Sequence, residues 1–131
     1  MNPDLEAAIV GAFIAKQKRE RLLLILRSPQ RTRKLQEQFP HESRWDPRVV
    51  VPIPVAQQTA ERLHAELLRR GAKNEVYLIS ANPKLDARSW NLVDALQEVV
   101  GSSSGTLVSC IPDRLAYFEG EAPGDRFILA R

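Results

Sequence analysis

The chain has 131 residues, of which 44% are hydrophobic and 27% are charged, and its formal net charge is +3. This length suits one domain with its own core, and the composition is typical of a folded protein rather than a disordered one. The single cysteine, Cys110, excludes an intramolecular disulfide and a zinc site built from several thiolates. We therefore expect one domain over residues 1–131, with a basic helical part over 1–44 and an α/β core over 45–131.

The first residues predict neither a secretory signal nor a membrane anchor. The chain starts with the acidic residues Asp4 and Glu6, whereas a secretory signal starts with basic residues. The longest uncharged apolar run, residues 7–15, is too short to span a bilayer. We expect a cytoplasmic protein with no membrane partner.

The N-terminal part predicts two helices. Residues 4–27 place apolar side chains on one face at helical spacing, which indicates a long first helix. Within it, residues 22–26 are apolar on every side, which suits either a fully buried helix or a short strand; their leucines and the lack of turn residues favour helix. Ser28 and Pro29 then indicate the start of a second helix over 29–39.

The rest of the chain alternates predicted strands and helices. Strands are expected over 49–51, 76–79, 106–111, 115–119 and 126–129. Helices are expected over 55–70, ending at Gly71, and over 86–100, capped by Asp86. Since helices connect the first three strands, we expect these strands to run parallel, with the connecting helices on one face and the N-terminal helices on the other.

The predicted fold class is therefore α/β, with a mixed, mostly parallel five-stranded sheet. Three parallel strands carry the crossover helices, and the last two strands extend the sheet as an antiparallel hairpin. Two N-terminal helices pack on this sheet. The order of the strands stays open at this stage.

Positive charge gathers in one segment of the chain. Residues 16–34 hold eight basic residues and one acidic residue, a net charge of +7. Five of these basic residues are candidates for an exposed anion-binding surface: Lys18, Arg19, Arg31, Arg33 and Lys34. Such a surface suits the phosphates of a nucleic acid or an acidic protein. No aromatic residue lies within the segment to stack on bases, and a solvated helix face is the simpler alternative.

A second candidate site follows from the expected parallel strands. Ligands of open α/β sheets bind beside the carboxyl ends of the strands. Five side chains near those ends are able to bond or pair with a small molecule: Ser80, Asn82, Cys110, Asp113 and Arg114. The alternatives are a turn-forming role for Asn82 and a core position for Cys110.

No sequence motif indicates an enzyme or a cofactor. The chain lacks the glycine-rich phosphate loops, the nucleophile elbow and the zinc-protease pattern. Only His41 and His64 offer an imidazole base to Cys110, and neither is placed to serve it. The four acidic residues between 113 and 125 lack the spacing of a calcium loop, and we expect them to be solvated.

Together these features predict a binding module, without cofactor or metal, that uses its basic helical surface to bind a nucleic acid or an acidic protein. The alternative is a small-molecule binder or an enzyme that works at the strand ends. The apolar run over residues 22–26 also suits contact with a second copy of the chain, which makes a homo-oligomer a third expectation.

Overall fold

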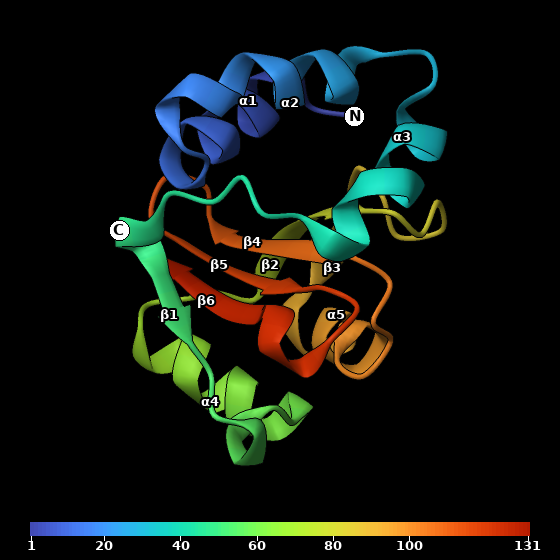
Figure 1. Ribbon diagram of the computed structural model, residues 1–131. Helices are drawn as coiled ribbons and strands as arrows, with labels where there is room; N and C mark the ends of the chain where they lie inside the picture. Colours follow the sequence, from blue (N-terminus) through green and yellow to red (C-terminus); the bar gives the residue numbers. More distant parts are fainter.

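The computed structural model describes residues 1–131 and shows three layers, with a sheet in the middle (Figure 1). Helices α1 (Pro3–Phe13), α2 (Arg19–Arg27) and α3 (Arg31–Gln38) cover one face of the sheet. Helices α4 (Ala60–Arg69) and α5 (Leu92–Val99) cover the other face. The expected division of the helices between the two faces is confirmed.

The sheet has six strands, and all neighbouring pairs are antiparallel. They are β1 (Val50–Pro52), β2 (Glu75–Ser80), β3 (Arg88–Asn91), β4 (Thr106–Ile111), β5 (Leu115–Glu119) and β6 (Arg126–Ala130). Their order across the sheet is β1-β6-β5-β4-β2-β3. The predicted mostly parallel sheet of five strands is therefore wrong, whereas the α/β class and the C-terminal antiparallel hairpin are confirmed.

The error arises from one strand that the sequence did not indicate. β3 pairs with β2 as a hairpin and reverses the direction of the chain before α5 begins. The helices still connect strands of the same direction, since β1 points the same way as β2, and β3 the same way as β4. Those strands are not neighbours, because β2 lies between β3 and β4, and three strands separate β1 from β2. The crossover rule thus holds for direction and fails for adjacency.

The start of α5 shows why β3 was missed. Asn91 ends β3, and its side-chain oxygen caps α5 by accepting hydrogen bonds from the backbone amides of Val93 and Asp94. The predicted cap, Asp86, lies before β3 and instead accepts from the backbone amide of Ser80. Asp and Asn are both favoured at the first position of a helix, so capping preference alone does not distinguish the two positions.

The predicted helix over residues 4–27 is two helices in the structure. α1 ends at Phe13, and Ile14 forms an isolated antiparallel bridge with Trp45 before the chain enters α2. A partner so distant in sequence leaves no trace in helical periodicity. Residues 22–26 lie in α2, so the helix alternative for this run is correct. No helix of the protein combines the length and the apolar character needed to cross a bilayer.

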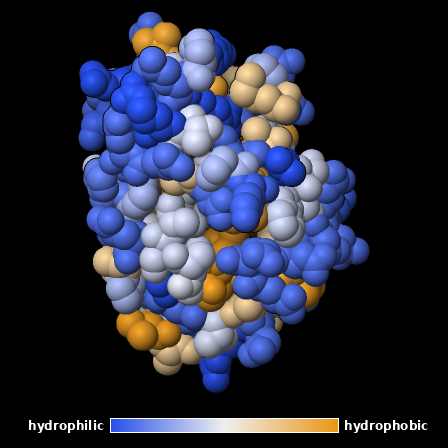
Figure 2. Space-filling view, turned by 90° about the vertical axis from the view of Figure 1, so that its right-hand side faces the viewer, coloured by the Kyte–Doolittle hydropathy of each residue, from blue (hydrophilic) through white to orange (hydrophobic).

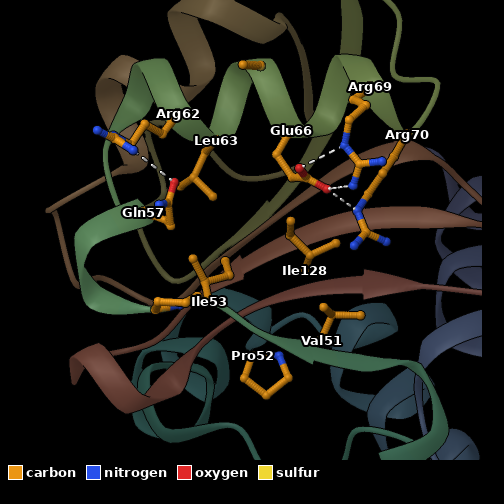
Figure 3. A pocket seen from close by; sticks show the side chains of 12 residues that line it. Val51, Pro52, Ile53, Gln57, Arg62, Leu63, Glu66, Arg69, Arg70 and Ile128 are labelled. Carbon is orange, nitrogen blue, oxygen red and sulfur yellow. Dashed lines mark hydrogen bonds and ion pairs between the residues drawn. The ribbon is translucent and has the colours of Figure 1, made fainter.

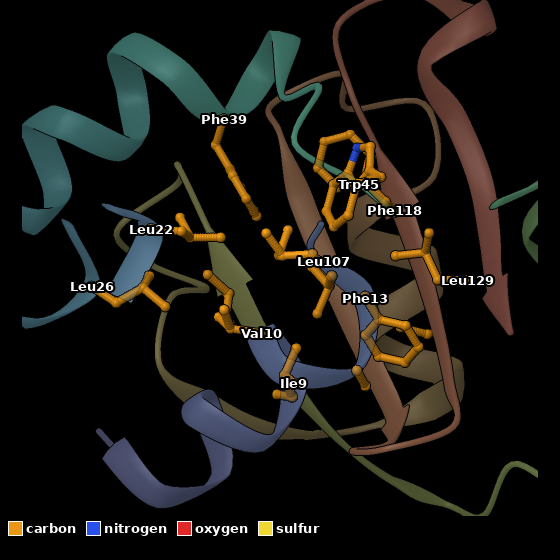
Figure 4. Packing of buried hydrophobic residues seen from close by; sticks show 14 of the residues in the cluster. Ile9, Val10, Phe13, Leu22, Leu26, Phe39, Trp45, Leu107, Phe118 and Leu129 are labelled. Carbon is orange, nitrogen blue, oxygen red and sulfur yellow. The ribbon is translucent and has the colours of Figure 1, made fainter. Parts of the chain in front are cut away.

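Hydrophobic packing occurs on both faces of the sheet. Beneath α1–α3, the ring of Phe118 packs against the rings of Phe39 and Trp45, with ring centroids 5.3 and 4.6 Å away (Figure 4). On the other face the packing is mostly aliphatic, and Leu63 and Leu67 of α4 are fully buried there. Burial on both faces explains the continuous apolar runs of β2 and β4, which the sequence alone suggested were parallel strands.

Candidate binding surfaces

The five residues predicted to share a strand-end site lie at opposite ends of the sheet. β2 and β4 are antiparallel, so Ser80 and Asn82 at the end of β2 lie beside the start of β4. Cys110, Asp113 and Arg114 follow at the far end of β4, roughly 14 Å away at the usual rise of a strand. The edge expected to gather the five side chains therefore does not exist. Ligand binding by either smaller group stays a prediction.

Ser80 and Asn82 bond to their own neighbourhood. The hydroxyl of Ser80 lies 2.7 Å from that of Thr106, and it accepts a hydrogen bond from the backbone amide of Asn82 at 3.0 Å. The side-chain oxygen of Asn82 accepts from the backbone amide of Lys84 at 3.0 Å, a contact typical of a turn. These contacts match the turn alternative for Asn82.

Cys110 has the environment of a core residue. Its side chain is 9% exposed, and its thiol donates only to the carbonyl of Val108, at 3.8 Å. Burial raises the pKa of the Cys110 thiol to about 12. A thiol with this pKa stays protonated near neutral pH, whereas a nucleophilic cysteine requires a thiolate. No group of three or more His, Cys, Asp or Glu side chains lies close enough together to hold a metal ion.

Arg31, predicted on the basic surface, is instead buried at the base of the helical layer. It is 7% exposed, and its guanidinium donates two hydrogen bonds to Glu6, each at 2.7 Å, and two to Asp86, each at 2.8 Å. The hydroxyl of Tyr77 also donates to Glu6, at 2.8 Å. Burial alone would lower the pKa of Arg31, but the bonds and charges of the two carboxylates raise it overall. Arg31 therefore joins α1 and α3 to the loop after β2 and is not part of an exposed surface.

The other predicted basic residues differ in their exposure and in whether they are paired or bonded. Arg33 is exposed and pairs with Glu37 at 2.8 Å. The half-buried Arg19 donates from Nε to the carbonyl of Ile14 at 2.9 Å, and Lys34 is half-buried. Lys18 is exposed and has no ion pair. The predicted surface over these residues is therefore narrower than the sequence indicates.

Three exposed cations without an ion pair form a short row along α2 and the residue that precedes it. Lys18, Arg21, Leu24 and Arg27 follow one another at intervals of three residues, so each lies next to the one before it and the row winds partly around the helix. The three cations are exposed, and the side chain of Leu24 is 64% exposed between two of them. We call these four residues the α2 stripe. Figure 2 shows another face of the molecule, where hydrophilic side chains predominate and apolar ones form small, separate spots.

A hollow of about 470 Å³ lies on the other side of the protein, between α4 and the edge strand β1 (Figure 3). This volume is in the range of small-molecule sites. Four apolar side chains form its floor: Val51, Ile53, Leu63 and Ile128. We call this hollow the α4–β1 cleft. The sequence predicted a strand and a helix here; Pro52 and Pro54 at the end of the strand are a local signal of an edge strand, which the interpretation as a buried strand did not use.

Arginines from α4 give the α4–β1 cleft a positive rim. Glu66 accepts hydrogen bonds from both Arg69 and Arg70, and these bonds lower the pKa of the Glu66 carboxyl to about 2. At the other end of the cleft, Arg62 donates to the neutral side chain of Gln57 at 3.3 Å. The residues that line the cleft thus include three guanidinium groups and one carboxylate, which leaves an excess of positive charge beside an apolar floor.

One of the acids expected to be solvated is fully buried. Glu119, which is 0% exposed, accepts hydrogen bonds from the backbone amides of Gly101 and Ser103 and from the hydroxyl of Tyr117. Burial and the adjacent carboxylate raise the pKa of Tyr117. Glu119 therefore holds the loop between α5 and β4 against the sheet, which removes it from any set of solvated ligands.

Comparison with protein-family models, curated proteins and solved structures gives no match for this chain.

Proposed function

We propose that the protein is a non-catalytic binding module and that its α2 stripe binds an acidic surface of another protein. The observation that carries this proposal is the exposure of Leu24 between Arg21 and Arg27. An apolar side chain bordered by cations suits a partner that offers an apolar contact surrounded by carboxylates.

The charges of the helical layer support this location. Arg31 and Arg33 are already paired with acids, so they add little to the external field. The α2 stripe has three exposed cations, and Glu20 is the only acidic residue of α2. Unpaired surface cations steer an anionic partner toward the site and raise the rate of encounter.

An acidic protein fits the α2 stripe better than a nucleic acid does. The aromatic residues near this layer, Phe13, Phe39 and Trp45, are buried and cannot stack on bases. Contact with hydrophilic phosphates would not bury the apolar surface of Leu24. Contact with a protein partner would bury it, which favours binding. A nucleic acid remains the alternative outcome of the test.

The buried Cys110 supports a non-catalytic role. Its raised pKa keeps the one thiol of the chain protonated, and no hydrogen bond joins it to a base. The homo-oligomer expected from residues 22–26 stays a prediction. Three residues of that run, Leu22, Ile25 and Leu26, are buried within the chain itself, so they are not free to contact a second copy.

The test is fluorescence anisotropy with two labelled peptides, measured over a range of salt concentrations. One is an amphipathic helical peptide with glutamates on one face and leucines on the other, and the second is polyglutamate. We expect the amphipathic peptide to bind more tightly, and binding to weaken with salt. Arg21→Glu together with Arg27→Glu should weaken it about tenfold or more, and Leu24→Ala about fivefold.

A matched control separates the α2 stripe from net charge. Arg88→Glu together with Arg114→Glu changes the net charge equally at two exposed positions outside the stripe, and should leave binding unchanged. Equal weakening by the control would overturn the proposed location. Tighter binding of single-stranded DNA or RNA, indifferent to Leu24→Ala, would replace the protein partner with a nucleic acid.

A further inference from the structure

We propose that the α4–β1 cleft is a second binding site, separate from the α2 stripe, and that it takes a small monocarboxylate with an apolar body. This inference goes beyond the proposed function, because it concerns the other face of the sheet and a different class of ligand. It follows from the floor of the cleft, from the position of Arg70, and from the charge around that residue.

The floor of the cleft offers apolar surface that the fold leaves uncovered. Val51 and Ile53 are half-buried, whereas Leu63 and Ile128 beneath them belong to the core. This surface stays open because α4 and α5 both pack on this face of the sheet, and no further element covers β1 at its edge. An apolar ligand body gains free energy in proportion to the apolar area that it covers here.

Arg70 is placed to bind an anionic head group at one end of this floor. It donates from Nε to Glu66 at 2.7 Å, and neither of its Nη groups makes a hydrogen bond. Figure 3 shows its guanidinium on the strand side of α4, next to Ile128. The side chain is 28% exposed, so a bond formed there is screened by water less than one at the open surface. The free ends of a guanidinium match the two oxygens of a carboxylate.

The net charge of Arg69, Arg70 and Glu66 together matches a single ligand carboxylate. Arg69 and Arg70 share the one carboxylate of Glu66, which leaves one positive charge without a counter-charge. Hydrogen bonds from both arginines keep Glu66 ionised, with a pKa of about 2, so this excess is constant over the physiological range. A monocarboxylate neutralises it, whereas a phosphate ester would bring more negative charge than the group compensates.

An added peptide strand fits the cleft less well than a small molecule. β1 has only three residues, and its last one, Pro52, has no backbone N–H to donate. Pro54 follows two residues later and lacks the donor as well. Prolines on an edge strand are a recognised obstacle to pairing with another strand. The ligand is therefore expected to bind through side chains and apolar surface rather than through the backbone of β1.

The test is an NMR titration of the isotopically labelled protein with octanoate, with acetate as the head group alone and 1-octanol as the apolar body alone. Octanoate should shift the amide resonances of α4 and β1 and bind at least tenfold more tightly than either fragment. Arg70→Gln should weaken octanoate binding about tenfold. Ile53→Ser should weaken it severalfold, and an otherwise unchanged spectrum would show that the fold is retained.

Two control variants separate the α4–β1 cleft from nonspecific binding and from the α2 stripe. Arg88→Gln removes an exposed cation at the opposite edge of the sheet and should leave octanoate binding unchanged. Arg21→Glu with Arg27→Glu should also leave it unchanged, which keeps this test independent of the α2 stripe. Octanoate binding no tighter than acetate or 1-octanol, shifts centred beneath α1–α3, or full affinity in Arg70→Gln would each overturn the proposal.

Discussion

The two faces of the sheet add different polar anchors to their apolar packing. On one face, the guanidinium of Arg31 connects α1 and α3 to the loop after β2 through the carboxylates of Glu6 and Asp86. On the other face, α4 and α5 pack through aliphatic side chains, and the buried Glu119 binds backbone amides of the loop that follows α5. Both faces pack through apolar side chains; the first face adds a buried network of charged side chains, and the second adds one buried loop anchor.

This difference has consequences for binding. On the first face, Glu6 and Asp86 neutralise the charge of Arg31, and the α2 stripe presents exposed cations without an ion pair. On the second face, the apolar contacts do not extend to the margin of the sheet, and the α4–β1 cleft remains beside β1. Each proposed site is thus a part of the surface that the packing of its own face leaves unused.

The largest expected effect comes from removing the charge at the centre of the first face. Arg31→Met leaves the carboxylates of Glu6 and Asp86 buried without a cation, and we expect the free energy of unfolding to fall by about 3–5 kcal/mol. Urea unfolding at neutral pH measures this loss. Adding Glu6→Gln and Asp86→Asn to the variant should restore part of it, because the uncompensated charges are then absent.

A control on the same helix shows whether burial is the cause. Arg33→Met removes an arginine two residues further along α3, where the ion pair with Glu37 is exposed. Exposed pairs contribute little, so we expect a change within about 0.5 kcal/mol. Equal losses for the two variants would show that Arg31 acts through helix propensity rather than through its buried carboxylates.

The anchor on the second face should give a smaller effect. Glu119→Gln keeps the shape of the side chain but replaces one acceptor oxygen by an amide NH2, a donor that opposes a donor backbone N–H or hydroxyl. We expect the free energy of unfolding to fall by about 1–3 kcal/mol. Chemical unfolding measures it, with the exposed Glu121→Gln as the control. A loss as large as that of Arg31→Met would mean that both faces depend on buried charge to the same degree.

The sequence predicted local structure on the second face better than on the first. Leucines at helical spacing placed Leu63 and Leu67 of α4 in the core, and Gly71 ends the helix with a φ of +106°, as expected from a left-handed cap. Arg31 pairs with residues 25 and 55 positions away, and no local pattern records such partners. The basic residues next to Arg31 in the sequence suggested an exposed anion-binding surface, although the charge of Arg31 itself is buried.

The arrangement of the strands was not predictable from their patterns. The sequence placed β3 in the first turns of a helix over 86–100, because Arg88, Ser89 and Asn91 are polar and do not form the apolar pattern of a strand; the position of β3 at the edge of the sheet allows these residues. Missing β3 reversed the inferred direction of β4, and Cys110 was consequently placed beside Ser80. The α4–β1 cleft was missed for a related reason, since the strand beside α4 lies at an edge only through the pairing of β1 with β6.

The thiol on the second face gives a pH-dependent prediction. The pKa of Cys110 is about 12 in the fold, above its ordinary value of 9.0, because burial opposes the thiolate. The unfolded chain therefore loses its thiol proton first as the pH rises. The contribution of Cys110 to stability is complete below pH 9 and is lost between pH 9 and 12.

The measurement is unfolding at pH 7 and at pH 10, in the protein and in Cys110→Ala. We expect the protein to lose about 1 kcal/mol more than the variant between the two pH values. Tyr77, whose pKa burial raises to about 12, changes in the same direction but is present in both proteins, so the difference isolates Cys110. The same pH-dependent loss in both would show that the thiol is accessible to water and that the second face opens more readily than its packing implies.

The smallest expected effect is a gain on the first face, at a glycine within α1. A Cβ added at Gly11 would meet no atom within 4 Å, so Gly11→Ala should raise the free energy of unfolding by about 0.5–1 kcal/mol through helix propensity. Gly105→Ala is the opposite case, since its Cβ would lie 2.6 Å from the backbone nitrogen of Pro40 at a φ of +82°. Thermal unfolding should therefore separate the two variants in sign. A gain at Gly11 would mean that the ion network and the helices of this face stabilise it independently, whereas no gain would mean that the contacts of Arg31 already fix α1.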